Sequence, residues 1–173
     1  MKRYLIVILI QFVSIYCFSQ INRTIWGVTL GQSSKQQVST MLIRKGYTVK
    51  NEDDGSLSIK VQSVDFGGGI WSYVAFDFVG GYLSQITFQN NEYDSPININ
   101  DTYKKVKSLL DTKYRKYYIG TPPGYIITDI SDYSDGKTTI YLAIGNNKGR
   151  FVNITYRVDY LDKKRQQNAI DEL

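Results

Sequence analysis

Carboxylates are the side chains of this sequence best suited to catalysis, because the chain contains no histidine and only one cysteine. Without histidine, neither a Ser-His-Asp triad nor a Cys-His pair can form. An acid-pair glycosidase would need two carboxylates facing each other across a cleft, and Asp65 and Asp77 are the candidates beside aromatic segments. Alternation turns Asp77 away from Phe76 and Phe78, as expected for an exposed strand position. We therefore expect no catalytic residue and predict that the protein is not an enzyme.

Acidic clusters could also hold a metal ion. Asp129, Asp132 and Asp135, followed by Gly136, resemble a calcium loop. An EF-hand, however, spaces its acids two apart and closes with a glutamate, whereas these acids are three apart. They are interpreted as a hairpin turn, and the acidic run 52–55 likewise. Histidine zinc sites are excluded, and no phosphate loop or dinucleotide fingerprint occurs. We expect no metal and no cofactor.

The amino terminus has the pattern of a secretory signal. Lys2 and Arg3 precede an apolar run over 4–16, and Cys17-Phe18-Ser19 supplies small residues for a cut before Gln20. Residues 1–19 are therefore predicted to be a signal peptide. The apolar run is short for a membrane span, which needs about 20 residues. The mature protein is expected in the periplasm or outside the cell, with no stable membrane span.

Cys17 raises the alternative of a lipoprotein signal cut just before it. That motif requires a small residue immediately upstream, and Tyr16 is bulky, so lipidation is not favoured. After a cut at Ser19 the mature chain has no cysteine. No disulfide can then stabilise it outside the cytoplasm, and thiolate zinc sites are excluded.

Composition indicates a globular, strand-rich protein. The chain is 42% hydrophobic and 21% charged, and its 15 tyrosines favour strands. The formal charge of +5 falls to +3 once Lys2 and Arg3 leave with the signal. Basic runs at 104–107, 113–116 and 163–165 are interpreted as solvated helix faces and a basic tail. We expect no nucleic-acid partner, and an anionic lipid or glycan is the alternative for these runs.

The pattern predicts helices and strands in a repeated order. A capping box at 33–37 begins a helix over 34–45, and strands are expected at 47–50, 57–66, 70–78 and 82–89, with Gly80-Gly81 as a hairpin turn. Pro96 marks a junction. Asp101 then caps a second helix, followed by strands at 125–130, 137–145 and 150–160 and a charged tail, for which a loose helix is the alternative.

These elements predict an α+β protein of two tandem units. Each unit is a helix followed by an antiparallel meander, with the helices on one face of the sheet; the units span 20–92 and 97–173. Residues 73–76 and 86–88 match 141–144 and 154–156, which supports an internal repeat. Chance similarity between two alternating hairpins is the alternative.

The run Trp26-Gly27-Val28-Thr29-Leu30-Gly31, followed by a capped helix ending at Lys45-Gly46-Tyr47, resembles small exported proteins of Bacteroidota. The doubled layout resembles the β-lactamase inhibitor protein fold, and each half resembles the outer-membrane assembly lipoproteins of the SmpA/OmlA family. The sequence departs from these families because it lacks the inhibitor's disulfide cysteines and a lipobox. The resemblance implies a non-catalytic, protein-binding role, although fold alone is a weak guide to function.

Alternation assigns the strand residues to two faces. Apolar residues such as Val74, Phe88 and Leu142 should face the helices. The other face should carry a mixture typical of recognition surfaces. Its predicted residues are Trp71, Tyr73, Leu83, Gln85, Thr87, Tyr141, Phe151, Asn153, Thr155 and Arg157. A merely solvated face is the alternative, because tyrosine and threonine also suit exposed strands.

The sequence thus predicts an exported, non-enzymatic module that binds a protein partner in the cell envelope. The predicted binding residues are Trp71, Tyr73, Gln85, Tyr141, Phe151, Asn153 and Arg157. Recognition of a carbohydrate or peptidoglycan strand by the same aromatic residues is one alternative. An acid-only hydrolase using Asp65 or Asp77 is another.

Overall fold

The computed structural model describes residues 20–51, 59–91, 99–120, 127–146 and 150–171. The predicted signal peptide, most of the junction around Pro96 and the acidic run 52–55 lie outside these ranges. The described hydrophobic core runs from Ile21 to Leu161. A chain that begins at Gln20 therefore contains every residue of this core.

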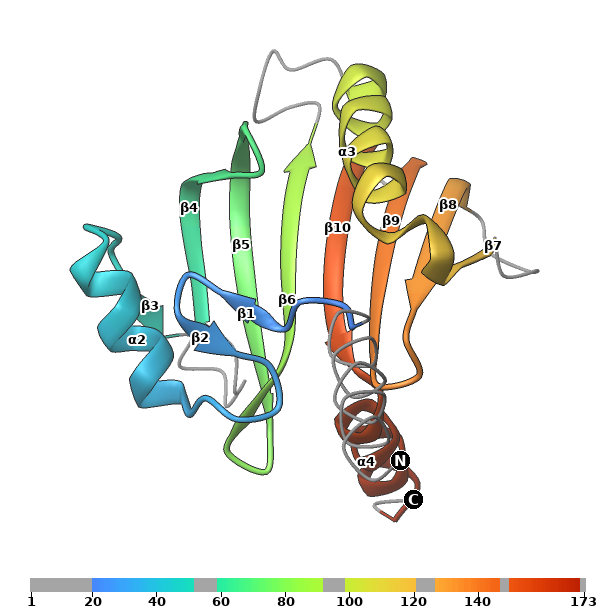
Figure 1. The fold of residues 1–173 in the computed structure, drawn as a ribbon. Coiled ribbons are helices and arrows are strands. Elements are labelled where there is room, and N and C mark those ends of the chain that lie inside the picture. Colours follow the sequence, from blue (N-terminus) through green and yellow to red (C-terminus); the bar gives the residue numbers. More distant parts are fainter. Residues whose placement is uncertain (1–19, 52–58, 92–98, 121–126, 147–149, 172–173) are drawn as a thin grey trace, which may run out of the picture.

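One antiparallel sheet of eight strands organises the described structure (Figure 1). Its order is β3-β4-β5-β6-β10-β9-β8-β7, so the last strands of the two halves, β6 and β10, pair at the centre. The strands are β3 (Lys50–Asn51), β4 (Ile59–Phe66), β5 (Gly69–Val79), β6 (Tyr82–Asn91), β7 (Tyr118–Gly120), β8 (Ile127–Ser134), β9 (Thr138–Asn146) and β10 (Arg150–Val158). Most of the expected strands are present, but the one expected at 47–50 begins only at Lys50, the one expected at 125–130 continues to Ser134, and β7 was not predicted.

Helix α2 (Lys35–Arg44) forms as its capping signal predicts. The Ser34 hydroxyl accepts from the Gln37 backbone N–H at 3.3 Å, and the Gln37 side chain accepts from the Ser34 N–H at 2.8 Å. Val38 and Leu42 are one helical turn apart and both are fully buried. A small hairpin that the sequence did not suggest, β1 (Thr24–Ile25) and β2 (Val28–Thr29), lies beside α2.

Helix α3 (Ile99–Tyr114) packs across β9 and β10. It begins two residues before Asp101, which therefore lies in the first turn rather than at the cap. Its buried Tyr103 hydroxyl lies 3.1 Å from the Ser131 hydroxyl of β8, and its Asp111 accepts from the Tyr133 hydroxyl at 2.6 Å. A short 3-10 turn (Arg115–Tyr117) then leads into β7. These contacts place α3 on the face that carries the aliphatic core.

The charged tail forms helix α4 (Asp159–Asp171), which agrees with the helical alternative for this segment, although the preceding strand ends at Val158 rather than at 160. Leu161 is its buried apolar anchor, and Tyr160 donates to the Gly31 carbonyl at 3.1 Å. Asp162 lies 3.1 Å from Arg157, and Arg165 donates to Ser84 at 2.9 Å. Polar contacts of this kind are not visible in hydrophobic periodicity, and α4 has no apolar stripe.

The fold class is therefore α+β, with three described helices and a large antiparallel sheet. The strands do not form separate meanders, because β6 and β10 join them into one sheet. The placement of helices on one face needs a correction for α4, whose Asp162 pairs with Arg157 of β10 and whose Arg165 donates to Ser84 of β6.

Candidate functional site

The sheet face opposite α3 carries a continuous polar surface over its four central strands. Residues opposite each other in an antiparallel pair share a face. Across β6 and β10, Gln89 faces Asn153 and Thr87 faces Thr155, while Tyr73 of β5 and Tyr141 of β9 extend the rows outward. We call this surface the polar face. It comprises Tyr73, Gln85, Thr87, Gln89, Asn91, Tyr141, Phe151, Asn153, Thr155 and Arg157, all half-buried.

Six of the seven predicted binding residues lie on this face, although they come from two separate segments of the chain, 73–85 and 141–157. The pairing of β6 with β10 brings them together. They are Tyr73, Gln85, Tyr141, Phe151, Asn153 and Arg157. Gln89 and Asn91 were not singled out from the sequence, although continuing the alternation of β6 past Thr87 would have included both.

The assignment of Trp71 to the polar face was wrong. Trp71 is 2% exposed and lies in the core with its ring centroid 5.9 Å from that of Phe88. The alternation of buried and exposed residues is interrupted at the same height in β4 and β5. In β4 the buried residues are 61 and then 64, and in β5 they are 71 and then 74, so the spacing is three residues instead of two. Ser63 has a left-handed backbone (φ 53°) at this level. Gln62 stays opposite Tyr73 while Val64 stays opposite Trp71, so both strands change face together without a shift of register.

The neighbouring strand accommodates the same change of face. The Ser72 N–H donates to the Asn90 side-chain oxygen at 2.6 Å, and the Asn90 amide donates to the Ile70 carbonyl at 3.1 Å. Asn90 is 1% exposed, so its side chain replaces ladder hydrogen bonds that the bend in β5 removes. The Trp71 indole donates to the Phe66 carbonyl at 3.0 Å. Trp71 is therefore a core residue with a satisfied polar atom.

Leu83 was also assigned to the wrong face. It is fully buried and pairs with Phe78. The β5–β6 register shifts between Asp77 and Phe78, so Asp77 pairs with Gln85 while Phe78 pairs with Leu83. This irregularity reverses the side on which Leu83 lies.

Hydrogen bonds between side chains fix the polar face. The Gln85 amide donates to Asp77 at 2.9 Å and to the Thr87 hydroxyl at 3.2 Å. The Thr87 and Thr155 hydroxyls are 3.2 Å apart across β6 and β10. The Gln89 amide donates to the Asn91 oxygen at 2.6 Å. These bonds restrict rotamers before any partner binds, which lowers the entropy cost of association.

Arg157 joins the polar face to α4. Its guanidinium carbon lies 4.5 Å from the Tyr141 ring centroid, it donates to the Tyr141 hydroxyl, and it forms an ion pair with Asp162. The Thr139 hydroxyl donates to Asp159 at 2.8 Å beside this pair. Burial raises the pKa of the Tyr141 hydroxyl, and the positive charge of Arg157 partly opposes that shift. Tyr141 therefore acts as a neutral hydrogen-bonding group.

Asp132 is the notable residue that sequence reasoning missed. It was expected in a turn, but it lies within β8 opposite Tyr141, only 1% exposed. Its Oδ1 atom has no hydrogen-bond partner. Burial raises the pKa of Asp132 to about 6, against a smaller opposing effect of Arg157. Asp135, by contrast, is in the predicted turn and accepts from the Lys137 and Thr138 N–H groups.

Asp65 and Asp77 cannot act as a facing pair. Asp65 pairs with Ile70 near the β4–β5 turn, so the two acids are separated by roughly 23 Å along the strand direction. Retaining and inverting glycosidases need carboxylates about 5 to 9.5 Å apart. Burial raises the pKa of Asp77, opposed by Arg165, by the Gln85 hydrogen bond and by Lys60. Its contacts are those of a structural carboxylate.

The far end of the Phe151 ring lies close to Gly145, its partner on the neighbouring strand. A Cβ atom added at Gly145 would lie 2.6 Å from the Phe151 ring. Gly145→Ala should therefore displace this ring and lower the free energy of unfolding by about 1–3 kcal/mol. Urea denaturation of the single variants and of Gly145→Ala with Phe151→Ala would test this. The loss should shrink when Phe151 is already alanine, and an equal loss in both backgrounds would contradict the contact.

No group of three or more potential metal-ligating side chains occurs among the described residues. Within the same residues, no helix has the length and apolar character needed to cross a membrane. No protein-family model, curated protein or solved structure matches the chain. Functional inference therefore rests on the residues of the site.

Proposed function

We propose that the protein is a non-enzymatic binding module that recognises a protein partner through the polar face. The observation that carries this proposal is the convergence of half-buried Tyr, Asn, Gln, Thr and Arg side chains on four adjacent strands. This composition is typical of recognition surfaces. Export to the cell envelope, and recognition of a partner located there, are part of the proposal and rest on the sequence of residues 1–19.

The composition of the polar face favours a protein over a glycan as the ligand. The Arg157 guanidinium covers one face of the Tyr141 ring, on which a sugar could otherwise stack. Most of the other side chains of the polar face carry amide or hydroxyl groups. These suit a partner that presents backbone and uncharged polar groups.

Binding to such a face should depend little on salt. Arg157 is already paired with Asp162, and Asp77 is hydrogen-bonded to Gln85, so few unpaired charges remain for steering. We expect the partner's Kd to change less than about threefold between about 50 mM and about 500 mM salt. Isothermal titration over this range checks the expectation. A hundredfold loss of affinity at the higher salt concentration would indicate instead that the partner binds the basic surface of α3.

Site-specific photocrosslinking tests the proposal in the native envelope. A photoreactive amino acid would replace Gln89 or Asn153 on the polar face, and Lys104 or Thr112 on the exposed side of α3 as matched controls. The proposal predicts that both polar-face positions capture the same discrete protein and that the α3 positions do not. Capture from α3 alone, or of glycan by the polar-face positions, would refute it.

We also propose that the chain consists of two related units. The order α2-β3-β4-β5-β6 is followed by α3-β7-β8-β9-β10, and the sheet order is symmetric about the β6–β10 pair. The matching segments 86–88 and 154–156 pair with each other, so that Thr87 lies opposite Thr155. This symmetry supports duplication, with the polar face centred on the junction of the units.

A further inference from the structure

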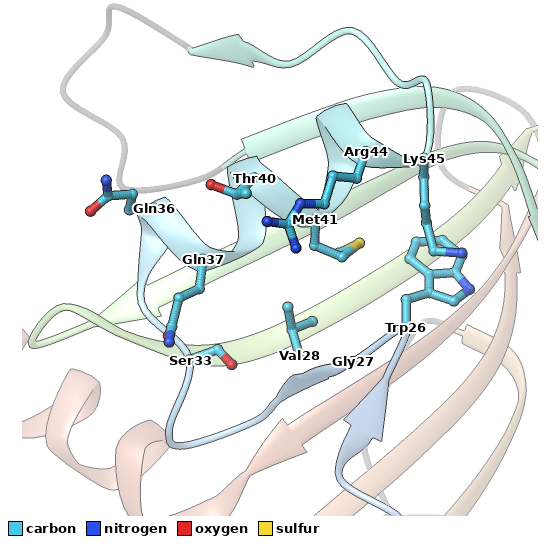
Figure 2. Close-up of a pocket in the computed structure, with 10 residues that line it drawn as sticks. All are labelled: Trp26, Gly27, Val28, Ser33, Gln36, Gln37, Thr40, Met41, Arg44 and Lys45. Atoms are coloured by element: carbon cyan, nitrogen blue, oxygen red, sulfur yellow. The ribbon is translucent and has the colours of Figure 1, made fainter.

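A groove of about 590 Å³ lies between α2 and the β1–β2 hairpin, away from the polar face (Figure 2). Val28, Met41 and the Trp26 indole supply its apolar surface, and α2 adds polar side chains such as Thr40. Its volume is within the range of small-molecule sites.

Trp26 occupies an unusual backbone position at one end of this groove. Trp26 (φ 54°) and Gly27 (φ 86°) form the two-residue turn between β1 and β2. Asparagine and glycine are usual where φ is positive, and a bulky residue is strained there. Ring packing offsets the strain: the Trp26 centroid lies 5.6 Å from Phe88, 5.9 Å from Phe66 and 6.1 Å from Tyr47. The strained turn thus fixes the indole as a wall of the groove.

Two cations reach the groove from the carboxyl end of α2. The Lys45 ammonium lies 5.3 Å from the Trp26 ring centroid, a cation–π contact that holds it in place. Figure 2 shows the Arg44 guanidinium and the Lys45 ammonium on either side of the Met41 side chain. No carboxylate is among the described residues that line this groove. Among these described residues, no carboxylate therefore neutralises the positive charge of the walls.

A second basic hollow, on α3, has a different balance of charge. It encloses about 360 Å³, and its Lys107 ammonium lies 2.7 Å from Asp111. Hydrogen bonds from Lys107 and from the Tyr133 hydroxyl hold the pKa of Asp111 below its usual value. A carboxylate of the protein thus already occupies this hollow. The described lining of the α2 groove, by contrast, contains cationic side chains and no carboxylate.

We propose that the α2 groove binds a small organic acid, a carboxylate on a short aliphatic chain. The carboxylate would accept hydrogen bonds from the Arg44 guanidinium on one side of Met41, and the Lys45 ammonium on the other side would add positive charge to the groove. The chain would lie along Met41 and Val28, out of water. This site is separate from the polar face, and the proposal does not depend on the proposed function.

Indole resonances provide a direct test, because the chain has only two tryptophans and Trp71 is buried. Protein from Gln20 onward would be titrated with hexanoate and observed by ¹H–¹⁵N spectroscopy, with Trp26→Phe assigning the two indole signals. We expect a saturable shift of the Trp26 signal and none of the Trp71 signal. Hexanamide and hexylammonium, which have the same chain without the negative charge, should produce no saturable shift.

Variants distinguish binding in the α2 groove from non-specific attraction of hexanoate to positive charge. Arg44→Gln with Lys45→Gln should weaken hexanoate binding at least tenfold, about the loss of one charge-assisted hydrogen bond. Lys104→Gln with Arg115→Gln, in the α3 hollow, should leave it unchanged. An unchanged Trp71 signal will show that each variant is folded. The proposal is overturned if hexanoate gives no saturable shift or if hexanamide binds equally well. It is also overturned if the α3 double variant loses as much affinity for hexanoate as the Arg44→Gln, Lys45→Gln variant.

Discussion

Trp71→Ala should lower the free energy of unfolding by about 3–5 kcal/mol, the usual cost of truncating a buried large aromatic residue. Trp71 is 2% exposed and contacts Phe88 in the core. The substitution also leaves the Phe66 carbonyl without the indole donor that lies 3.0 Å away. The cavity and the unpaired carbonyl both lower the free energy of unfolding. Trp71→Ala should therefore be among the most destabilising single substitutions in the chain.

Tyr73→Ala is the matched control, because Tyr73 is two residues along the same strand but on the polar face. Its side chain is half-exposed, so its removal should cost about 1 kcal/mol or less. Urea denaturation followed by circular dichroism measures both values. Equal losses for the two variants would mean that Trp71 is on the polar face after all and that the change of face at Ser63 is absent.

Asp132→Asn should stabilise the protein above pH 6. Burial raises the pKa of Asp132 from 3.8 to about 6, so between these values the native state keeps a proton that the unfolded state releases. The free energy of unfolding therefore falls as pH rises from about 4 to 6 and stays lower above pH 6. A shift of two pKa units corresponds to about 3 kcal/mol at most.

The asparagine variant removes this titration, since its amide stays neutral. We expect the free energy of unfolding of this variant to exceed that of the parent by about 1–3 kcal/mol at pH 8 and to differ little from it at pH 4. Denaturation curves at both pH values check this, with Asp65→Asn, an exposed position on β4, as the control that should change stability by under about 0.5 kcal/mol. A destabilised variant at pH 8 would show that ionised Asp132 is needed by Arg157 or Tyr141.

Local signals allowed much of the fold to be predicted. The Ser34 capping box, the Gly80-Gly81 hairpin and the alternation along β6 and β10 act over a few residues, so sequence alone can identify them. Alternation also placed Tyr73 and Asn153 on the same face. Their proximity depends on the β6–β10 pairing, which no local pattern encodes.

The errors arose where tertiary contacts override local pattern. Trp71 was misplaced because the change of face at Ser63 depends on how β4 and β5 bend together. Helix α4 was missed as a packed element because it is held by an ion pair and by Leu161 rather than by an apolar stripe. Asp132 resembled a turn residue because burial of a charge cannot be recognised from its neighbours in the sequence.

The central claim is that the polar face recognises a protein partner, and the most direct test is the affinity of the crosslinked protein, once purified, for matched triple variants. Tyr73→Ala, Gln89→Ala and Asn153→Ala would be combined on the polar face, and Lys104→Ala, Ser108→Ala and Thr112→Ala on α3. The account predicts that the polar-face variant loses at least a hundredfold, about 2.7 kcal/mol, while remaining folded, and that the α3 variant binds like the parent. Undiminished binding by the folded polar-face variant would contradict the account.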